Sequence, residues 1–228
     1  VIRWQLPIAP SAAKTYMPVL IGLSIAGVIY GSIVALRQKD VKKLLAYSSL
    51  AHVGLIAAGC YTLTLDGLSG AVSQMIAHGF VIVGLFFAAE VIFRRYETRT
   101  IADLGGIRSQ TPKFTSMFMI LVLASVALPG TFNFVGEFTV LYSLSQVNIW
   151  FAVLGGTTII LGAYYMLKMF QDVMLGETNT KVFSEVTVNE AITFVAIIAF
   201  LLFFGLYPKP IVDLVTPSLN EILEVINK

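Results

Sequence analysis

Long apolar stretches alternate with short polar segments along nearly the whole chain. The hydrocarbon core of a bilayer is about 30 Å thick, and a helix needs about 20 apolar residues to cross it. The pattern therefore predicts an all-α membrane protein with about six transmembrane helices, one of them broken. Their expected bounds are roughly 17–36, 44–63, 68–93, 114–144, 149–170 and 190–207, after an opening segment, 1–16, that resembles the end of a preceding helix and a loop.

The fourth stretch is too long for one straight helix. From Thr115 to Leu144 a straight helix would extend roughly 45 Å at about 1.5 Å per residue. Within this stretch Pro129 removes a backbone donor and clashes with the preceding turn, while Gly130 tolerates unusual dihedral angles. The sequence therefore predicts two half-helices separated by a break near residues 129–131. Inside a membrane such a break persists only where it faces protein or water.

A tail, residues 208–228, follows the last apolar stretch and contains three prolines. We expect these prolines to interrupt helical structure in this segment before a last helix begins. The apolar residues that come next recur at the spacing of one helix face, which predicts a short amphipathic helix on the membrane surface. They are Leu219, Ile222, Leu223 and Ile226.

Composition supports a membrane protein. Hydrophobic residues make up 57% of the chain and charged residues only 12%, with a mean hydropathy of +0.85. A soluble domain typically carries roughly a quarter charged residues, so a soluble helix bundle is disfavoured and the lipid bilayer is the expected surrounding. The net charge of +2 is too small to indicate a nucleic-acid partner. With Cys60 as the single cysteine, neither a disulfide framework nor a cysteine-rich metal or iron–sulfur site is indicated.

Basic residues concentrate in three segments. Most of the 15 Lys and Arg residues follow the first, third and fifth apolar stretches. If every stretch crosses the membrane, these segments lie on one side, and the positive-inside rule places them in the cytoplasm or the matrix. The residues concerned are Arg37, Lys39, Lys42, Lys43, Arg94, Arg95, Arg99, Arg108, Lys113, Lys168 and Lys181, against Arg3, Lys14, Lys209 and Lys228 on the other side.

An acidic residue, Glu137, follows the break in the second half-helix, and Asn133 lies one turn before it. No other charged residue occurs between Lys113 and Lys168. An acid within a membrane helix is by default a functional group, and the break and the acid both require a polar interior lined by protein. The alternative is that Glu137 lies near the membrane surface and extends its carboxylate into water.

Both histidines of the chain fall inside apolar stretches. His52 follows Ser48 by one helical turn, and His78 follows Gln74 by one turn, so each pair shares a helix face. Imidazole can pass a proton through its two nitrogens near neutral pH, which indicates a proton relay together with Glu137. A purely structural histidine on an apolar face is the alternative. Metal binding is disfavoured because neither helix carries a second histidine at ligand spacing.

Other residues carry weaker signals. Lys168, near the end of the fifth stretch, could extend to the interface or approach Glu137, and we favour the interface. Tyr164 and Tyr165 are expected to face lipid or neighbouring helices.

No phosphate-binding loop, dinucleotide fingerprint or haem ligand set occurs, so no cofactor is expected in this chain. Four glycines are expected to let helices approach closely: Gly54, Gly59, Gly79 and Gly84.

Four segments in order resemble one family: "RQKDVKKLLAYSSLAHVGLI", "MIAHGFVIVGLFF", "RYETRTIADLGGI" and "LPGTFNFVGEF". They are similar to the antiporter-like membrane subunits of respiratory complex I, and the similarity extends over nearly the whole chain. Cation/proton antiporter subunits of the Mrp type are similar throughout the same region. Within the family, "VGEF" favours the M-subunit branch (chain 4 in mitochondria), because sister subunits place a lysine where this chain has Glu137.

The resemblance implies a larger helical core of two inverted repeats, each with a broken helix, of which this chain corresponds to the C-terminal portion. The spans that precede it in the family would lie upstream of Val1. By motif, Glu137 matches the acid of the second broken helix, and His52 and His78 match the histidines of a central polar axis. Lys42 matches a basic position on the cytoplasmic side, for which we expect a structural role.

The implied function is proton translocation in NADH:quinone oxidoreductase, in the bacterial or mitochondrial inner membrane. Sister antiporter-like subunits and other membrane subunits of complex I would be the partners. NADH, FMN, iron–sulfur clusters and quinone would be bound by partner subunits. Two alternatives stay open: a Mrp-type sodium/proton antiporter subunit, and a structural membrane scaffold without a transport role.

Overall fold

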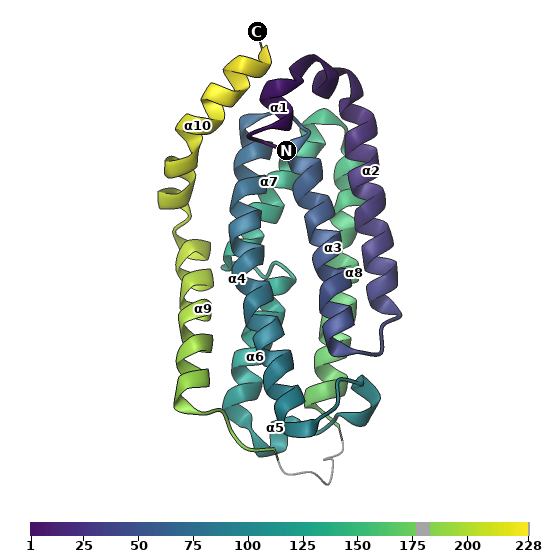
Figure 1. The fold of residues 1–228 in the computed structure, drawn as a ribbon, viewed down its shortest axis with the longest axis vertical. Helices are drawn as coiled ribbons and strands as arrows, with labels where there is room; N and C mark the ends of the chain where they lie inside the picture. The colour runs from purple at the N-terminus through teal and green to yellow at the C-terminus, as the bar shows by residue number, and fades with distance from the viewer. Residues whose placement is uncertain (177–182, 228) are drawn as a thin grey trace.

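Long helices run side by side along the long axis of the molecule in the computed structural model, which describes residues 1–176 and 183–227 (Figure 1). Lys181 and Lys228, which were counted with the basic segments, lie outside the described residues. The helices are α1 (Gln5–Ile8), α2 (Pro10–Leu36), α3 (Val41–Cys60), α4 (Leu65–Tyr96), η1 (Ile101–Asp103), α5 (Ile107–Gln110), α6 (Pro112–Ser125), α7 (Phe132–Val147), α8 (Ile149–Met174), α9 (Val188–Leu206) and α10 (Lys209–Asn227).

The predicted membrane-crossing bundle is confirmed. Within the described residues, α2, α3, α4, α8 and α9 are long and apolar enough to cross a membrane, and α6 is a shorter apolar helix that continues into α7 after a break. Most boundaries differ from the predicted ones by two to four residues, and the largest difference is at α2, which begins at Pro10 rather than at residue 17. Proline at the first helical position needs no hydrogen-bond acceptor, and the polar residues after it extend the helix beyond the apolar stretch.

The break in the fourth stretch is wider than predicted. Helix α6 ends at Ser125 and α7 begins at Phe132, so the interruption starts before residues 129–131. Pro129 explains the upstream end, since it cannot donate to the carbonyl of Ser125 and its ring would clash with that group. Ala127 and Gly130 both adopt positive φ, 54° and 96°, a conformation that cannot continue a right-handed helix.

The tail forms one helix from Lys209. Pro208 lies in the interruption between α9 and α10, as expected, but the expectation was wrong for Pro210 and Pro217, which lie within α10. Pro210 lies in the first turn, where no amide donor is needed, and Pro217 is accommodated inside the helix. The amphipathic character was predicted correctly, but Leu219 and Ile226 are buried at 3% and 2% exposure. The apolar face of α10 therefore packs on the helix bundle rather than only on a membrane surface.

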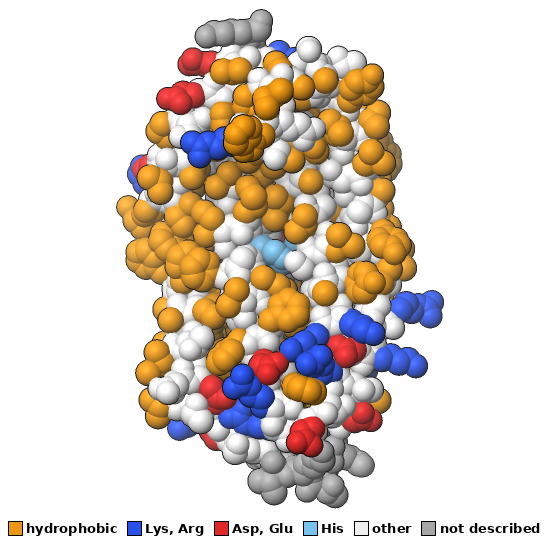
Figure 2. Space-filling model, viewed as in Figure 1, with side chains coloured by type: hydrophobic (Ala, Val, Ile, Leu, Met, Phe, Trp, Pro, Cys, Tyr) orange, Lys and Arg blue, Asp and Glu red, His pale blue; other side chains and the backbone are white. Residues whose placement is uncertain are grey.

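The described basic segments gather at one end of the bundle. The segments before α3 and after α4 pair through Val41 N to Arg99 O at 3.0 Å and Ile101 N to Lys39 O at 2.8 Å. The segment after α8 joins them, because Gly106 donates to the carbonyl of Leu175. Figure 2 shows Lys and Arg side chains in a band across the lower part of the molecule, with apolar side chains above it.

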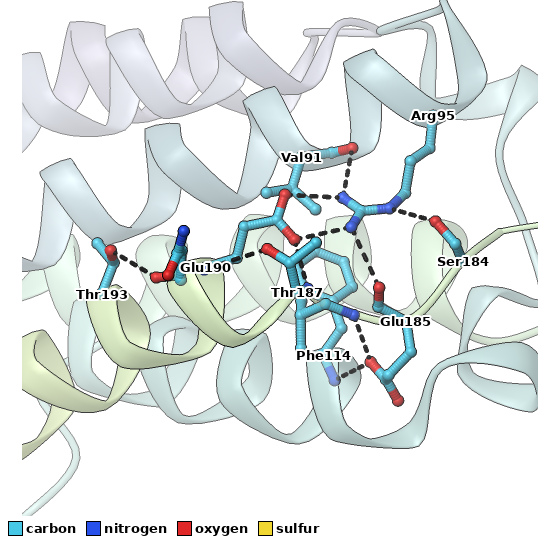
Figure 3. Close-up of polar contacts among 10 residues, drawn as sticks. Val91, Arg95, Phe114, Ser184, Glu185, Thr187, Glu190 and Thr193 are labelled. Carbon is cyan, nitrogen blue, oxygen red and sulfur yellow. Dashed lines mark hydrogen bonds and ion pairs between the residues drawn. The ribbon is translucent and has the colours of Figure 1, made fainter.

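Arg95, at the end of α4, is the centre of a polar clamp at this basic end (Figure 3). Its guanidinium contacts the carboxylate of Glu190 in α9 at two points, 2.8 Å and 3.3 Å. It also donates to the Ser184 hydroxyl and to the carbonyl oxygens of Glu185 and Val91. A bidentate pair with so many supporting bonds is geometrically specific, so it fixes the start of α9 against α4.

The same clamp reaches the broken helix. The Glu185 carboxylate accepts from the amides of Lys113 and Phe114, both at 3.1 Å, and so caps the first turn of α6. Glu190 accepts from the amide of Thr187, whose hydroxyl in turn accepts from the amide of Glu190, which forms a capping box at the start of α9. Two carboxylates thus satisfy the amides at two helix starts and anchor α6 beside α9.

Glycines set several helix contacts, as predicted, with one exception. A Cβ added at Gly54 would lie 2.8 Å from the carbonyl oxygen of Ser24, and one added at Gly84 would lie 2.9 Å from the side chain of Leu121. At Gly59 an added Cβ would also contact the neighbouring helix. The expectation was wrong for Gly79, where nothing lies within 4 Å.

A further glycine, Gly205 near the end of α9, lies directly against the break. A Cβ added there would lie 2.6 Å from the Cα of Thr131 and would also meet the carbonyl of Gly130. Backbone atoms cannot move aside as a flexible side chain can. Helix α9 is therefore held to the broken helix at both ends, by the Arg95 clamp and by Gly205.

We predict that Gly205→Ala destabilises the folded chain by about 1–3 kcal/mol, because the added methyl group overpacks a backbone contact. Thermal unfolding in detergent, followed by circular dichroism, measures this change. Gly156→Ala in α8 is the matched control, since nothing lies within 4 Å of its added Cβ. Equal melting temperatures for the two variants would contradict a tight contact at Gly205.

Candidate functional site

Glu137 lies on α7 just after the break and is buried, with 1% of its surface exposed. Gln74 of α4 donates from Nε2 to Glu137 Oε1 at 3.0 Å. His52 of α3 places Nδ1 2.7 Å from the same oxygen, an ion-pair distance, although the ring is not aligned for a regular hydrogen bond. The structure thus brings the acid and one histidine into direct contact, and Glu137 does not extend to the membrane surface.

His78 of α4 continues the row beyond His52. The centroids of the two imidazole rings are 5.1 Å apart, and His78 Nε2 lies 2.8 Å from the hydroxyl of Ser49 on α3. Both rings are buried, with 3% exposure for His52 and 7% for His78. Glu137, His52 and His78 therefore form one line of titratable groups across three helices.

Two of the expected supporting contacts are arranged differently. Gln74 shares a helix with His78 but bonds Glu137, and Ser49 is the hydroxyl partner of His78. Ser48 accepts a hydrogen bond from the hydroxyl of Tyr165 at 3.1 Å. The spacing along one helix identified polar residues correctly but did not identify their partners, which come from neighbouring helices.

Asn133 is fully buried one turn before Glu137. Within residues 1–176 and 183–227, neither its amide oxygen nor its amide nitrogen has a hydrogen-bond partner, and the same holds for Glu137 Oε2 and Gln74 Oε1. Buried polar atoms nearly always have a partner, either protein or ordered water. These atoms, all close to the break, therefore define a polar interior suited to bound water.

Close packing of α7 on α4 makes the Glu137 site possible. A Cβ added at Gly136 would lie 2.7 Å from the Cα of Gln74, so only glycine permits this approach. Gly136 immediately precedes the acid, and the approach brings Glu137 within reach of Gln74. The sequence "VGEF" thus places a packing residue and a functional residue side by side.

The two candidate lysines lie away from the axis. Lys42 forms an ion pair with Glu90 of α4 at 2.7 Å, which ties the start of α3 to α4 and supports the structural role expected for it. Lys168 pairs with Asp172 on its own helix, also at 2.7 Å, with 53% of its side chain exposed. Of the two alternatives for Lys168, the interfacial position agrees with the structure and the approach to Glu137 does not.

Two further residues contact this site. Tyr165 was expected to face lipid or neighbouring helices, and it faces a neighbouring helix, because it is 2% exposed and bonds Ser48 of α3. Ser49 was not considered, although it contacts His78. Neither residue has a local signal, because a hydroxyl in an apolar helix points inward or outward according to how that helix is rotated in the bundle.

The fold and the site define a class: a polytopic helical membrane protein in which a broken helix carries a buried acid next to a row of histidines. Comparison with a sequence model of one protein family identifies the chain more closely. The chain belongs to the NADH:quinone oxidoreductase/Mrp antiporter transmembrane family, whose sequence model matches residues 1–162.

Relatives within this family are similar over the whole of the chain. It is 40% identical to NADH-quinone oxidoreductase subunit M of Rickettsia bellii over 225 residues, which cover 97% of the chain and 46% of that protein. The corresponding protein of Mycobacterium tuberculosis is 36% identical and is covered to 41% of its length. The chain therefore spans less than half the length of these relatives.

Solved structures show the same fold. A chain of respiratory complex I from Thermus thermophilus superposes with a TM-score of 0.94 at 29% identity, covering 99% of this chain and 48% of that one. A chain of the Mrp complex from Dietzia superposes with a TM-score of 0.84 at 18% identity, covering 92% and 49%. At that low identity the second similarity concerns the fold alone.

We predict that Gln74 and Glu137 are energetically coupled. In a double-mutant cycle with Gln74→Leu and Glu137→Leu, the coupling free energy of unfolding should be about 1.5–3 kcal/mol, the range for hydrogen bonds to charged groups. Denaturation in detergent measures it. Gln74→Leu combined with Ser145→Ala is the control, because among the described residues Ser145 bonds only within its own helix. Coupling below about 0.5 kcal/mol would show that the contact does not stabilise the fold.

Proposed function

We propose that this chain is a proton-translocating membrane subunit of an NADH:quinone oxidoreductase. The contact of His52 Nδ1 with Glu137 Oε1 at 2.7 Å is the observation that carries the proposal, because it places an acid and a base at proton-transfer distance inside a membrane bundle. His78, whose ring centroid lies 5.1 Å from that of His52, extends the relay. The similarity to NADH-quinone oxidoreductase subunit M supports the respiratory setting.

Electrostatics favours one proton at a time on the relay. Two positive charges about 5 Å apart repel by roughly 3 kcal/mol at an effective dielectric constant of about 20, so a second proton on the pair of histidines is strongly disfavoured. A negative charge on Glu137 stabilises a proton on His52. When that proton moves to the carboxylate, His52 can accept the next one. A change of charge at one of these groups therefore alters the electrostatic energy of its neighbours in the row.

The remaining parts of the proposal concern the whole complex. The chain supplies the proton path, while NADH, FMN, iron–sulfur clusters and quinone bind to partner subunits. Sister antiporter-like subunits lie beside it in a bacterial or mitochondrial inner membrane. The basic segments that contain Lys39 and Arg99 face the cytoplasm or the matrix, as the positive-inside rule requires.

Glu137→Gln tests the proposal in the assembled respiratory complex. The amide keeps the shape and the hydrogen bond with Gln74 but cannot exchange a proton, so NADH-driven proton pumping should fall by about tenfold or more. Pumping is measured in membrane vesicles with a pH-sensitive dye, and the assembled complex is quantified on native gels.

Glu221→Gln in α10 is the matched control, because it makes the same change at an exposed position far along the chain. It should pump like the unmodified complex. Full proton pumping by an assembled Glu137→Gln complex would eliminate the proposed role, and it would favour a structural scaffold instead.

Purification distinguishes the respiratory complex from an Mrp-type antiporter. We expect an affinity-tagged chain to co-purify from native membranes with subunits that carry flavin and iron–sulfur clusters, detected by absorbance and electron paramagnetic resonance. Co-purification with small membrane subunits alone, together with sodium-dependent proton exchange in vesicles, would instead assign the chain to an antiporter.

A further inference from the structure

A cavity of about 820 Å³ opens at the basic end of the bundle, between the start of α3, η1 and the end of α8. Exposed charged groups surround its mouth, and a buried tyrosine forms part of its wall. Its lining includes Lys39, Leu44, Leu104, Tyr165, Lys168 and Asp172. The ion pair of Lys168 with Asp172 places two charged groups at the rim of this cavity.

Tyr165 connects this cavity with the interior. It lines the cavity, yet it is 2% exposed, and its hydroxyl donates to Ser48 Oγ at 3.1 Å. Ser48 is itself buried on α3, one turn after Leu44 of the cavity wall and one turn before His52. Along one face of α3 the order is therefore cavity wall, hydroxyl and imidazole.

The spacing along α3 is short enough for proton transfer. Residues four apart on a helix are separated by about 6 Å along the axis, and their Cβ atoms lie about 5–6 Å apart. One water molecule can bridge such a gap between Ser48 and His52, since water-mediated hydrogen bonds are nearly as favourable as direct ones. Without the two hydroxyls, the same distance would be lined by apolar side chains such as Leu44 and Leu45.

We propose that Tyr165 and Ser48 form a proton inlet, which connects the cavity at the basic end with His52 and Glu137. The inlet rests on the proposed function, because it supplies protons to the same axis. It assigns a transfer role to a tyrosine on α8 and gives the axis a connection to the solvent on the side of the basic segments.

The transfer is balanced at every step. Tyr165 gives its hydroxyl proton to Ser48 Oγ along the existing hydrogen bond. In the proposed inlet, a proton that enters from the cavity through water replaces it on the tyrosine oxygen. Ser48 passes its own proton through water to His52, and each hydroxyl ends as it began. One proton leaves the cavity and one arrives at the imidazole, with no oxidant, reductant or other reactant involved.

A merely structural role for the hydrogen bond makes a different prediction. A buried tyrosine hydroxyl needs a partner, and Ser48 satisfies it whether or not protons pass. Loss of a structural bond lowers stability and assembly but leaves the proton pumping of each assembled complex unchanged. Loss of an inlet lowers pumping in complexes that assemble normally.

The test compares Tyr165→Phe and Ser48→Ala in the assembled complex, with proton pumping normalised to complex content. NADH oxidation by an artificial acceptor that bypasses pumping confirms that the redox part is intact. Each variant should lower the initial pumping rate by about threefold to fivefold, less than the loss of an essential acid because water partly replaces a hydroxyl. The double variant should be no slower than the slower single variant, since both residues act in one path.

Two comparisons separate the outcomes. Tyr142→Phe makes the same change at an exposed position on α7 and should pump normally, while Ser48→Thr retains a hydroxyl and should restore most of the rate lost in Ser48→Ala. If Tyr165→Phe does not assemble, the two Ser48 variants decide alone. Normal pumping by Tyr165→Phe or by Ser48→Ala, together with an inactive Glu137→Gln, overturns the inlet and leaves the proposed function intact. Normal pumping by Glu137→Gln overturns both.

Discussion

Burial of one carboxylate in an apolar bundle is the constraint on which the rest of the site depends. An isolated charge in such a medium is very unfavourable, so Glu137 requires polar partners on every side. Gln74 and His52 provide two of them on a single oxygen, from two different helices. Gly136 lets α7 approach α4 closely enough for these contacts, and the break before α7 supplies the polar surroundings in which a second oxygen can be solvated.

The break itself needs support, because freed backbone groups at membrane depth are stable only against protein or water. Helix α9 supplies that support from one side. Its start is fixed by Arg95 to α4 and, through Glu185, to the first turn of α6, while Gly205 lies against the backbone of Thr131. The half-helix geometry that holds Glu137 is thus anchored by a helix that carries no residue of the proposed proton path.

The polar groups form a continuous sequence from one end of the molecule towards its middle. The cavity at the basic end leads to the Tyr165–Ser48 hydrogen bond, and the next turn of α3 carries His52 beside Glu137. His78 and Ser49 branch from the same place. Four helices, α3, α4, α7 and α8, contribute to this line, so it depends on their relative rotation as much as on the residues themselves.

The sequence by itself determined the membrane-crossing stretches, the broken helix and the three titratable residues, because hydropathy, proline chemistry and buried charge are local properties of a segment. It did not determine the start of α2 or the continuous α10, where polar residues and tolerated prolines blurred the boundaries. Only the tertiary structure decided that Gln74 bonds Glu137, that Ser49 bonds His78 and that Tyr165 points inward. Those partners are set by how each helix is rotated and packed against others, which no spacing along one helix contains.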